Sequence, residues 1–205
     1  FENYKTLNFG IGAVDSLIHN WYSALNRNES SNCFHKNSTN IDFIIPNNFA
    51  GNQVKCDSNA YAGIYMFLNS PTDSIYQVRE YITGELDTTL TQNKCYKVSF
   101  KYSLAENVSH YAISNFGIYF SNTIPYNFTT GYSSNNLNYT PQIEVNQIMN
   151  DAVNWVIIER FYTATGNENY FTMGNFNNNA DTDTTFIKSG SFSLGVRASY
   201  VYLDD

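Results

Sequence analysis

The sequence predicts an all-β protein, a single β-sandwich of the jelly-roll type with long loops and little helix. Aromatic residues make up 17% of the 205 residues, with 17 Tyr and 15 Phe, and such residues are enriched in strands. Charged residues reach only 14%, too few to cover the outer faces of helices. Short segments of alternating polarity are separated by turn-rich segments, which is the pattern of a sandwich or jelly roll.

The clearest predicted strand is "YKVSFKYSL", residues 96–104, in which every second residue is apolar. One of its faces is therefore expected in the core, while Lys and Ser cover the other. "NFGIYFS", residues 115–121, repeats this pattern. The remaining predicted strands are "NWVIIERFYTA", whose buried face is ambiguous, "NYFTMGNF" and "SFSLGVRASYVYLDD".

The segment "PNNFAGNQVKCDSNAYAGIYMF" is interpreted as scaffold. "PNNFAGNQ" reads as a loop that crosses one end of the sandwich, and "NAYAGIYMF" reads as the strand that follows it. Ala62, Ile64 and Met66 would point to the core, with Tyr65 on the other face. The small residues in "NAYAG" would permit a close approach of another backbone.

Helix is expected only as a turn or two within residues 14–25 and 141–151. The chain shows no repeat of fixed period and no linker-like tract, so residues 1–205 are interpreted as one domain.

The net charge is −7 and no basic stripe is present, which excludes a nucleic-acid partner because such binding requires the neutralisation of phosphates. No apolar run approaches the roughly 20 residues that span a bilayer. An extracellular surface fits the low charge content.

Three cysteines leave at least one thiol unpaired within the chain. Cys33 and Cys56 lie in polar, loop-like segments and are expected to form a disulfide, with three free thiols as the alternative. Cys95 begins a strand and is expected to pack as a small apolar residue.

No catalytic constellation is visible in the sequence. The three histidines lie in unrelated segments, and no nucleophile elbow, P-loop or zinc-protease motif is present. Glu80 and Glu85 could be a glycosidase pair, but the preferred interpretation is an ion pair of Arg79 with one of them. The Asn- and Asp-rich loop "NFNNNADTDTT" could bind calcium, but a solvated turn is the preferred reading. The chain is therefore predicted not to be an enzyme.

Several blocks of the sequence occur in the order found in a known family. The blocks are "NAYAGI", "REYI", "NFGIYFS", "GNF" and "YLDD". With them, the chain resembles a jelly-roll domain of Bacteroidota surface proteins that often precedes an OmpA-like domain or a sorting tail. The opening "FE" and closing "YLDD" also resemble the ends of carbohydrate-binding jelly rolls. This resemblance implies a domain excised from a longer protein that is secreted or associated with the outer membrane or cell surface.

The resemblance to carbohydrate-binding modules also implies two sites. An acid at the start of the first strand and one near the end of the last often share a structural calcium, and Glu2 and Asp204 match these positions, with Asp205 as a substitute for Asp204. The alternative is two surface acids at frayed ends. Such modules stack aromatic side chains on sugar rings and bind hydroxyls with polar side chains. The residues expected on outward faces for this role are Tyr65, Arg79, Tyr81 and Tyr119.

These observations favour a non-catalytic carbohydrate-binding jelly-roll module whose partner is a glycan or surface polysaccharide. The alternative is a structural or adhesive component that contacts other surface proteins. A hydrolase is the weakest interpretation. A cleft lined by Tyr and Arg would favour the first, and a flat apolar patch the second.

Overall fold

The computed structural model describes residues 4–6, 9–10, 12, 14, 18–24, 31–69, 78–125, 136–188 and 196–205. Strands dominate these ranges, and the only complete helical element within them is the short 3-10 helix η1 (Ile41–Phe43). The predicted all-β class is confirmed.

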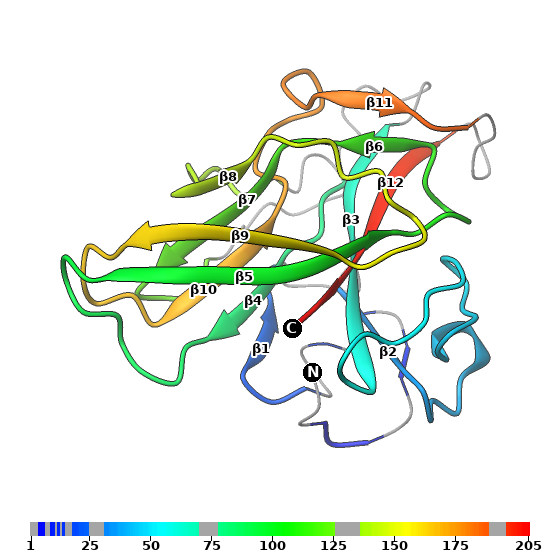
Figure 1. The fold of residues 1–205 in the computed structure, drawn as a ribbon, viewed down its shortest axis with the longest axis horizontal. Helices are drawn as coiled ribbons and strands as arrows, with labels where there is room; N and C mark the ends of the chain where they lie inside the picture. The colour runs from blue at the N-terminus through cyan, green and yellow to red at the C-terminus, as the bar shows by residue number, and fades with distance from the viewer. Residues whose placement is uncertain are drawn as a thin grey trace.

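Two five-stranded antiparallel sheets form the sandwich (Figure 1). The first has the order β1 (Trp21–Ser23), β4 (Ile82–Glu85), β10 (Tyr170–Gly174), β7 (Phe116–Ser121) and β8 (Ile143–Val145). The second has the order β2 (Asn32–His35), β3 (Ala60–Asn69), β12 (Arg197–Asp204), β5 (Cys95–Leu104) and β9 (Val156–Thr163). A separate pair joins β6 (Tyr111–Ile113) to β11 (Thr184–Phe186). The chain passes repeatedly from one sheet to the other, which is the connectivity of a jelly roll.

Aromatic stacking between the sheets forms much of the core. Phe100 of β5 stacks on Phe116 of β7 with ring centroids 4.8 Å apart, and all of Phe116 is buried. Phe120 of β7 stacks on Tyr162 of β9 at 4.3 Å with nearly parallel rings. The alternation predicted for β5 and β7 is thus confirmed, and it is also resolved for β9, where Ile158 and Tyr162 face inward.

The face of β3 and β12 that points away from the first sheet is also buried. The segment between β2 and β3, which contains η1, packs its aromatic side chains onto this face. Phe43 stacks on Phe34 at 5.6 Å, and Phe49 meets Tyr200 edge-on at 5.9 Å. Consequently β3 is buried along almost its whole length, which is why alternation alone does not describe it.

Asn48 holds this covering loop through its side-chain amide. Its Oδ1 accepts hydrogen bonds from the Tyr202 hydroxyl at 2.7 Å and from the backbone N–H groups of Ala50 and Gly51. Its Nδ2 donates to the Tyr61 hydroxyl at 3.1 Å. The interpretation of "PNNFAGNQ" as scaffold is supported, although the loop covers a sheet face.

One of the two segments expected to contain helical turns forms a strand instead, because β8 lies within residues 141–151 and pairs with β7. Within residues 14–25, Val14 is helical and its carbonyl accepts from the Ile18 N–H at 3.1 Å, while β1 further along pairs with β4. Each strand extends an edge of the first sheet. Pairing with a sheet edge overrides a weak local preference for helix because each added ladder satisfies several backbone groups at once.

Candidate functional site

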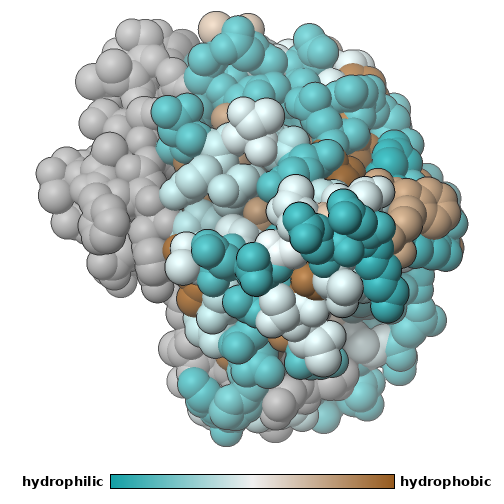
Figure 2. All heavy atoms as spheres, turned by 90° about the vertical axis from the view of Figure 1, so that its left-hand side faces the viewer, coloured by the Kyte–Doolittle hydropathy of each residue, from teal (hydrophilic) through white to brown (hydrophobic). Residues whose placement is uncertain are grey.

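A pocket of about 350 Å³ opens where the chain leaves β7 and where it enters β10. The pairing of β7 with β10 places Ser121 opposite Tyr170, so the segments following β7 and preceding β10 meet at one edge. The described residues that line the pocket are Tyr119, Phe120, Ser121, Asn122, Thr123, Pro125, Tyr139, Gln142, Thr165, Gly166, Asn167 and Glu168. Figure 2 views the end of the sandwich where β9 ends, and the coloured surface there is mainly hydrophilic.

Two tyrosine rings stack in this lining. Tyr119 projects from β7 on the side opposite to Phe120, because neighbouring residues of a strand point to opposite faces. Tyr139 comes from the segment before β8, and its ring centroid lies 4.7 Å from that of Tyr119 at an interplanar angle of 26°. Tyr139 is 39% exposed. An accessible aromatic ring is the type of surface on which the apolar face of a sugar stacks.

The side chain of Gln142 attaches the Tyr139 segment to β7. Backbone pairing between β7 and β8 ends at Ile118 and Ile143. Beyond it, Gln142 Oε1 accepts from the Phe120 N–H at 2.7 Å, and Gln142 Nε2 donates to the Phe120 carbonyl at 3.1 Å. These two bonds continue the ladder by one position and thereby position this wall of the pocket.

Glu168 also lines the pocket and is only 3% exposed. Its Oε1 accepts from the Tyr162 hydroxyl at 2.6 Å and from both the N–H and the hydroxyl of Thr165 at 2.7 Å. Its Oε2 is buried and has no hydrogen-bond partner among the described residues. Burial by itself would raise the pKa of Glu168, but the hydrogen bonds from Tyr162 and Thr165 outweigh it and lower the pKa to about 2.

Backbone conformation shapes the turn that carries Glu168. Gly166 and Asn167 adopt positive φ angles of 96° and 73°, which glycine and asparagine tolerate best. The turn therefore folds back so that the Thr165 N–H and hydroxyl reach the carboxylate three residues later. The turn-rich segment "TGNENY" encodes this local geometry.

Of the four predicted sugar-binding residues, only Tyr119 lines the pocket. Tyr65 is half-buried and packs edge-on against Tyr200 at 4.7 Å. Arg79 and Tyr81 are completely buried, so their predicted outward orientation is wrong. They precede β4 instead of alternating along it, and for this reason period-two reasoning does not apply to them.

The surroundings of Arg79 and Tyr81 explain their burial. The Arg79 guanidinium donates to Asn179 Oδ1 at 2.6 Å and to the Val78 carbonyl, and it lies over the Phe67 ring. Burial lowers the pKa of Arg79 to about 10. The Tyr81 hydroxyl donates to the Asn175 carbonyl at 2.7 Å and accepts from a backbone N–H.

The predicted ion pair of Arg79 with Glu80 or Glu85 is absent from the described residues. Glu80 is buried and accepts from the Tyr65 N–H at 2.9 Å, whereas Glu85 is exposed and accepts from the Tyr22 hydroxyl. In the Asn-rich loop, Asn179 binds Arg79 and Asn178 bonds to Asp181, so these side-chain oxygens stabilise a turn.

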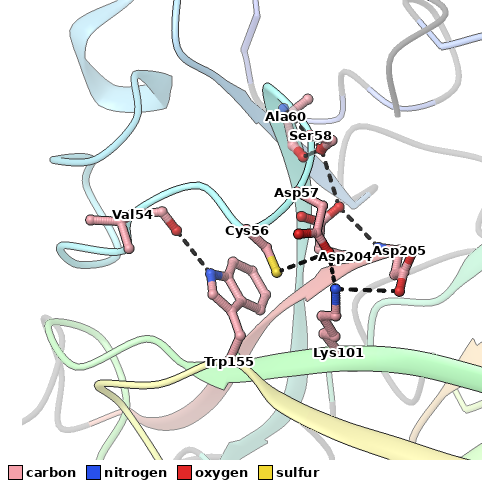
Figure 3. A network of polar contacts seen from close by, with 9 residues as sticks. All are labelled: Val54, Cys56, Asp57, Ser58, Ala60, Lys101, Trp155, Asp204 and Asp205. Carbon is pink, nitrogen blue, oxygen red and sulfur yellow. Dashed lines mark hydrogen bonds and ion pairs between the residues drawn. The ribbon is translucent and has the colours of Figure 1, made fainter.

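Asp204, predicted to hold calcium with Glu2, lies at the end of β12 and is 4% exposed (Figure 3). Its Oδ1 accepts from the Ser58 hydroxyl at 3.3 Å and from the Asp205 N–H at 2.9 Å. Its Oδ2 is buried without a partner among the described residues, and burial raises its pKa. Glu2 lies outside the described residues. Within those residues, no group of three or more His, Cys, Asp or Glu side chains is arranged to hold a metal ion.

Lys101 supplies positive charge beside this carboxylate. It forms ion pairs with Asp57 and Asp205, as Figure 3 shows. These two acids therefore have a cationic partner, whereas no described Lys, Arg or His side chain forms an ion pair with Asp204.

All three cysteines are free thiols, so the predicted Cys33–Cys56 disulfide is not formed. Cys33 is completely buried in β2, while the Cys56 thiol donates to the Asp57 carboxylate at 3.6 Å. The prediction for Cys95 is also wrong, because this residue is exposed at the first position of β5.

Sequence reasoning missed Tyr139, Gln142 and Glu168 among the pocket residues. One signal was available for Tyr139 and Gln142. From Tyr111 to Ile143 the chain contains no Asp, Glu, Lys, Arg or His, and this segment is rich in Asn, Tyr, Ser and Thr. Such a composition supplies neutral hydrogen-bonding groups and aromatic rings in one place.

Comparison with known proteins identifies weak structural likenesses. No family model matches the chain, and no curated protein matches it significantly. The K1 cleaved adhesin domain of Lys-gingipain from Porphyromonas gingivalis W83 is 11% identical, with a TM-score of 0.41 over 91% of this chain and 88% of that domain. The K2 cleaved adhesin domain of Lys-gingipain is 11% identical, with a TM-score of 0.43 over 92% and 87%.

A structure described as "CBM4 structure and function" is 8% identical, with a TM-score of 0.34 over 71% of this chain and 79% of that one. At these identities and TM-scores, the likenesses carry no argument about function, which has to come from the residues of the chain. In the part of the chain that the structure describes, no helix has the length and hydropathy of a membrane span.

Proposed function

We propose that this chain is a non-catalytic carbohydrate-binding module of a secreted or cell-surface protein, with the pocket at Tyr119 and Tyr139 as its site. One observation carries the proposal: a stacked tyrosine pair and a buried carboxylate line the same pocket. Small-molecule sites combine apolar or aromatic walls with a few polar groups and occupy about 300–1,000 Å³. A sugar presents both an apolar ring face and a set of hydroxyl donors, which match these two features.

The carboxylate suits recognition better than hydrolysis. Glycoside hydrolysis uses two carboxyl groups, one on each side of the scissile bond. Among the described lining residues Glu168 is the only acid, and one of its oxygens is already bound by three hydrogen bonds. The geometry therefore favours a binding module.

A glycan array with the purified chain tests the proposal, with Tyr139→Ala as the pocket variant. Tyr111→Ala is the matched control because Tyr111 is half-buried on β6, outside the pocket. We expect Tyr139→Ala to weaken binding by about tenfold or more, since it removes a stacking ring, and Tyr111→Ala to leave binding unchanged. Equal binding by all three proteins, or no binding by the folded chain, would contradict the proposal.

We further propose that Asp204 and Glu2 share a structural calcium. The buried Oδ2 of Asp204 supports this, because it has no hydrogen-bond partner among the described residues and a hard cation would compensate a buried carboxylate oxygen. At neutral pH we expect calcium to raise the melting temperature of the wild type. Asp204→Asn should abolish that response without lowering the melting temperature measured in chelator. A melting temperature that is the same in calcium and in chelator would refute the site.

A second candidate function rests on a different surface. β9 lies at the edge of its sheet, and on its outer face Ile157 is 57% and Phe161 is 72% exposed. Val54 and Val153 are also exposed, and the Trp155 indole donates to the Val54 carbonyl (Figure 3). Exposed apolar side chains on an edge strand are typical of a protein contact, which would suit an adhesive component.

An adhesion assay of the purified chain on whole cells separates the two functions. Loss of adhesion in Phe161→Lys, with adhesion retained in Tyr139→Ala, would favour the protein-contacting function. The reverse result would favour the carbohydrate-binding function.

A further inference from the structure

We infer that the pocket selects uncharged or amino sugars and rejects glycans that carry a carboxylate or sulfate on the ring it holds. This inference rests on the proposed function, and it specifies the class of ligand by charge. The evidence for it is the buried carboxylate of Glu168 together with the lack of basic side chains in the described pocket lining.

Among its described residues, the wall contains one buried acid. Glu168 is 97% removed from solvent, judged from its 3% exposure, and three donors converge on its Oε1. All three donors are neutral, since they come from a phenol, a backbone N–H and an alcohol. They stabilise the ionised carboxylate without cancelling its charge. A pKa of about 2 agrees with a carboxylate that stays ionised at every pH at which the protein would bind glycans.

No described lining residue supplies a compensating cation. The lining contains no Lys, Arg or His among the residues that the structure describes. The sequence extends this conclusion along one wall, because residues 111–143 contain no basic side chain at all. The segment that contributes the tyrosine pair therefore cannot neutralise an anionic ligand.

A negatively charged ligand would be repelled by the Glu168 carboxylate and bind more weakly, whereas a positively charged ligand would be attracted to it. Two like charges about 7 Å apart, at an effective dielectric constant of about 20, disfavour each other by a factor of roughly 50 in binding. Mobile ions screen part of this in physiological salt, so we expect at least about tenfold discrimination against anionic sugars. A protonated amino sugar would bind at least as well as its neutral counterpart.

The second oxygen of Glu168 adds to this selection. Oε2 is buried and has no hydrogen-bond partner among the described residues, so its charge is not compensated there and favours a ligand that places a hydroxyl or ammonium donor at the neighbouring pocket wall. A carboxylate or sulfate group has no proton to donate at neutral pH. Such a ligand would face the charge without compensation.

The test uses matched pairs of sugars with the full chain, followed by calorimetric titration of any pair in which one member binds. The pairs are methyl β-glucoside with methyl β-glucuronide, and lactose with 3′-sialyllactose, with glucosamine as the cationic probe. We expect the neutral member to bind at least about tenfold more tightly than the anionic member. Raising the salt concentration should reduce this ratio, because screening weakens the repulsion.

Two variants locate the origin of the selection. Glu168→Gln should bring the neutral-to-anionic ratio close to one. Glu144→Gln removes the same charge from an exposed position on β8, outside the pocket lining, and should leave the ratio unchanged. If Glu168→Gln does not fold, the salt dependence of the wild-type ratio decides, and a ratio insensitive to salt overturns the inference.

The outcomes also separate this inference from the proposed function. Equal binding of neutral and anionic sugars would overturn the inference and leave the carbohydrate-binding module in place. If no sugar in the panel or on the array binds to the folded chain, the proposed function fails and the inference fails with it.

Discussion

Acidification should remove the stabilising contribution of Glu168, and the structure sets its size. The pKa of this carboxyl falls from its ordinary value of 4.5 to about 2 in the folded chain. Each pKa unit corresponds to about 1.4 kcal/mol, so the contribution to the free energy of unfolding is about 3 kcal/mol. Because the folded state holds the proton less tightly than the unfolded state, this contribution is complete above about pH 5. It is lost as the pH falls through 4.5 towards 2.

Urea denaturation of the wild type and of Glu168→Gln, followed by intrinsic fluorescence between pH 2 and pH 7, measures this contribution. The variant should be less stable than the wild type by about 3 kcal/mol at pH 7, and the difference should shrink towards zero near pH 2. Glu144→Gln, which removes an exposed acid, should differ from the wild type by less than about 0.5 kcal/mol. Parallel stability curves for wild type and Glu168→Gln across this pH range would refute the assignment of these hydrogen bonds.

Two further substitutions test the packing of the covered sheet face. Asn48→Ala leaves the buried Tyr61 and Tyr202 hydroxyls without their amide partner and should lower the free energy of unfolding by about 2–4 kcal/mol, measured by urea denaturation. Unchanged stability would show that the covering loop does not depend on that amide. In Gly63→Ala the new methyl group would lie 2.4 Å from the Tyr200 hydroxyl, so we expect a loss of about 1–3 kcal/mol and a lower melting temperature. A melting temperature equal to that of the wild type would show that the tyrosine moves aside at little cost.

Local patterns predicted the strands well because a strand has a period of two that any short window reveals. β5 and β7 follow the predicted alternation, and β3 begins within a residue of the start of its predicted segment. The turn before Glu168 is also local, since glycine and asparagine supply its positive φ angles. The predictions failed where a segment is defined by distant partners. Residues 143–145, where a helical turn was predicted, form β8 because the edge of β7 lies beside them.

The candidate site was predictable only in part, for the same reason. Tyr119 was found because its position in an alternating strand indicates an outward side chain. Tyr139 and Glu168 lie in irregular segments 20 and 49 positions further along the chain, and no periodicity links them to Tyr119. Arg79 shows the opposite error: a charged residue that local reasoning places at the surface is completely buried, because Asn179, a hundred residues away, supplies its hydrogen bond.

Composition and alternation were enough to define an aromatic, weakly charged all-β chain, since those properties depend on each residue and its near neighbours. Tertiary structure decided which sheet face is covered, which tyrosines remain accessible and which carboxylates are buried. Those outcomes depend on contacts between segments far apart in the sequence. The loop around Asn48 covers the tyrosines of β3 and β12, whereas Tyr119 and Tyr139 line an open pocket with Glu168 in its wall.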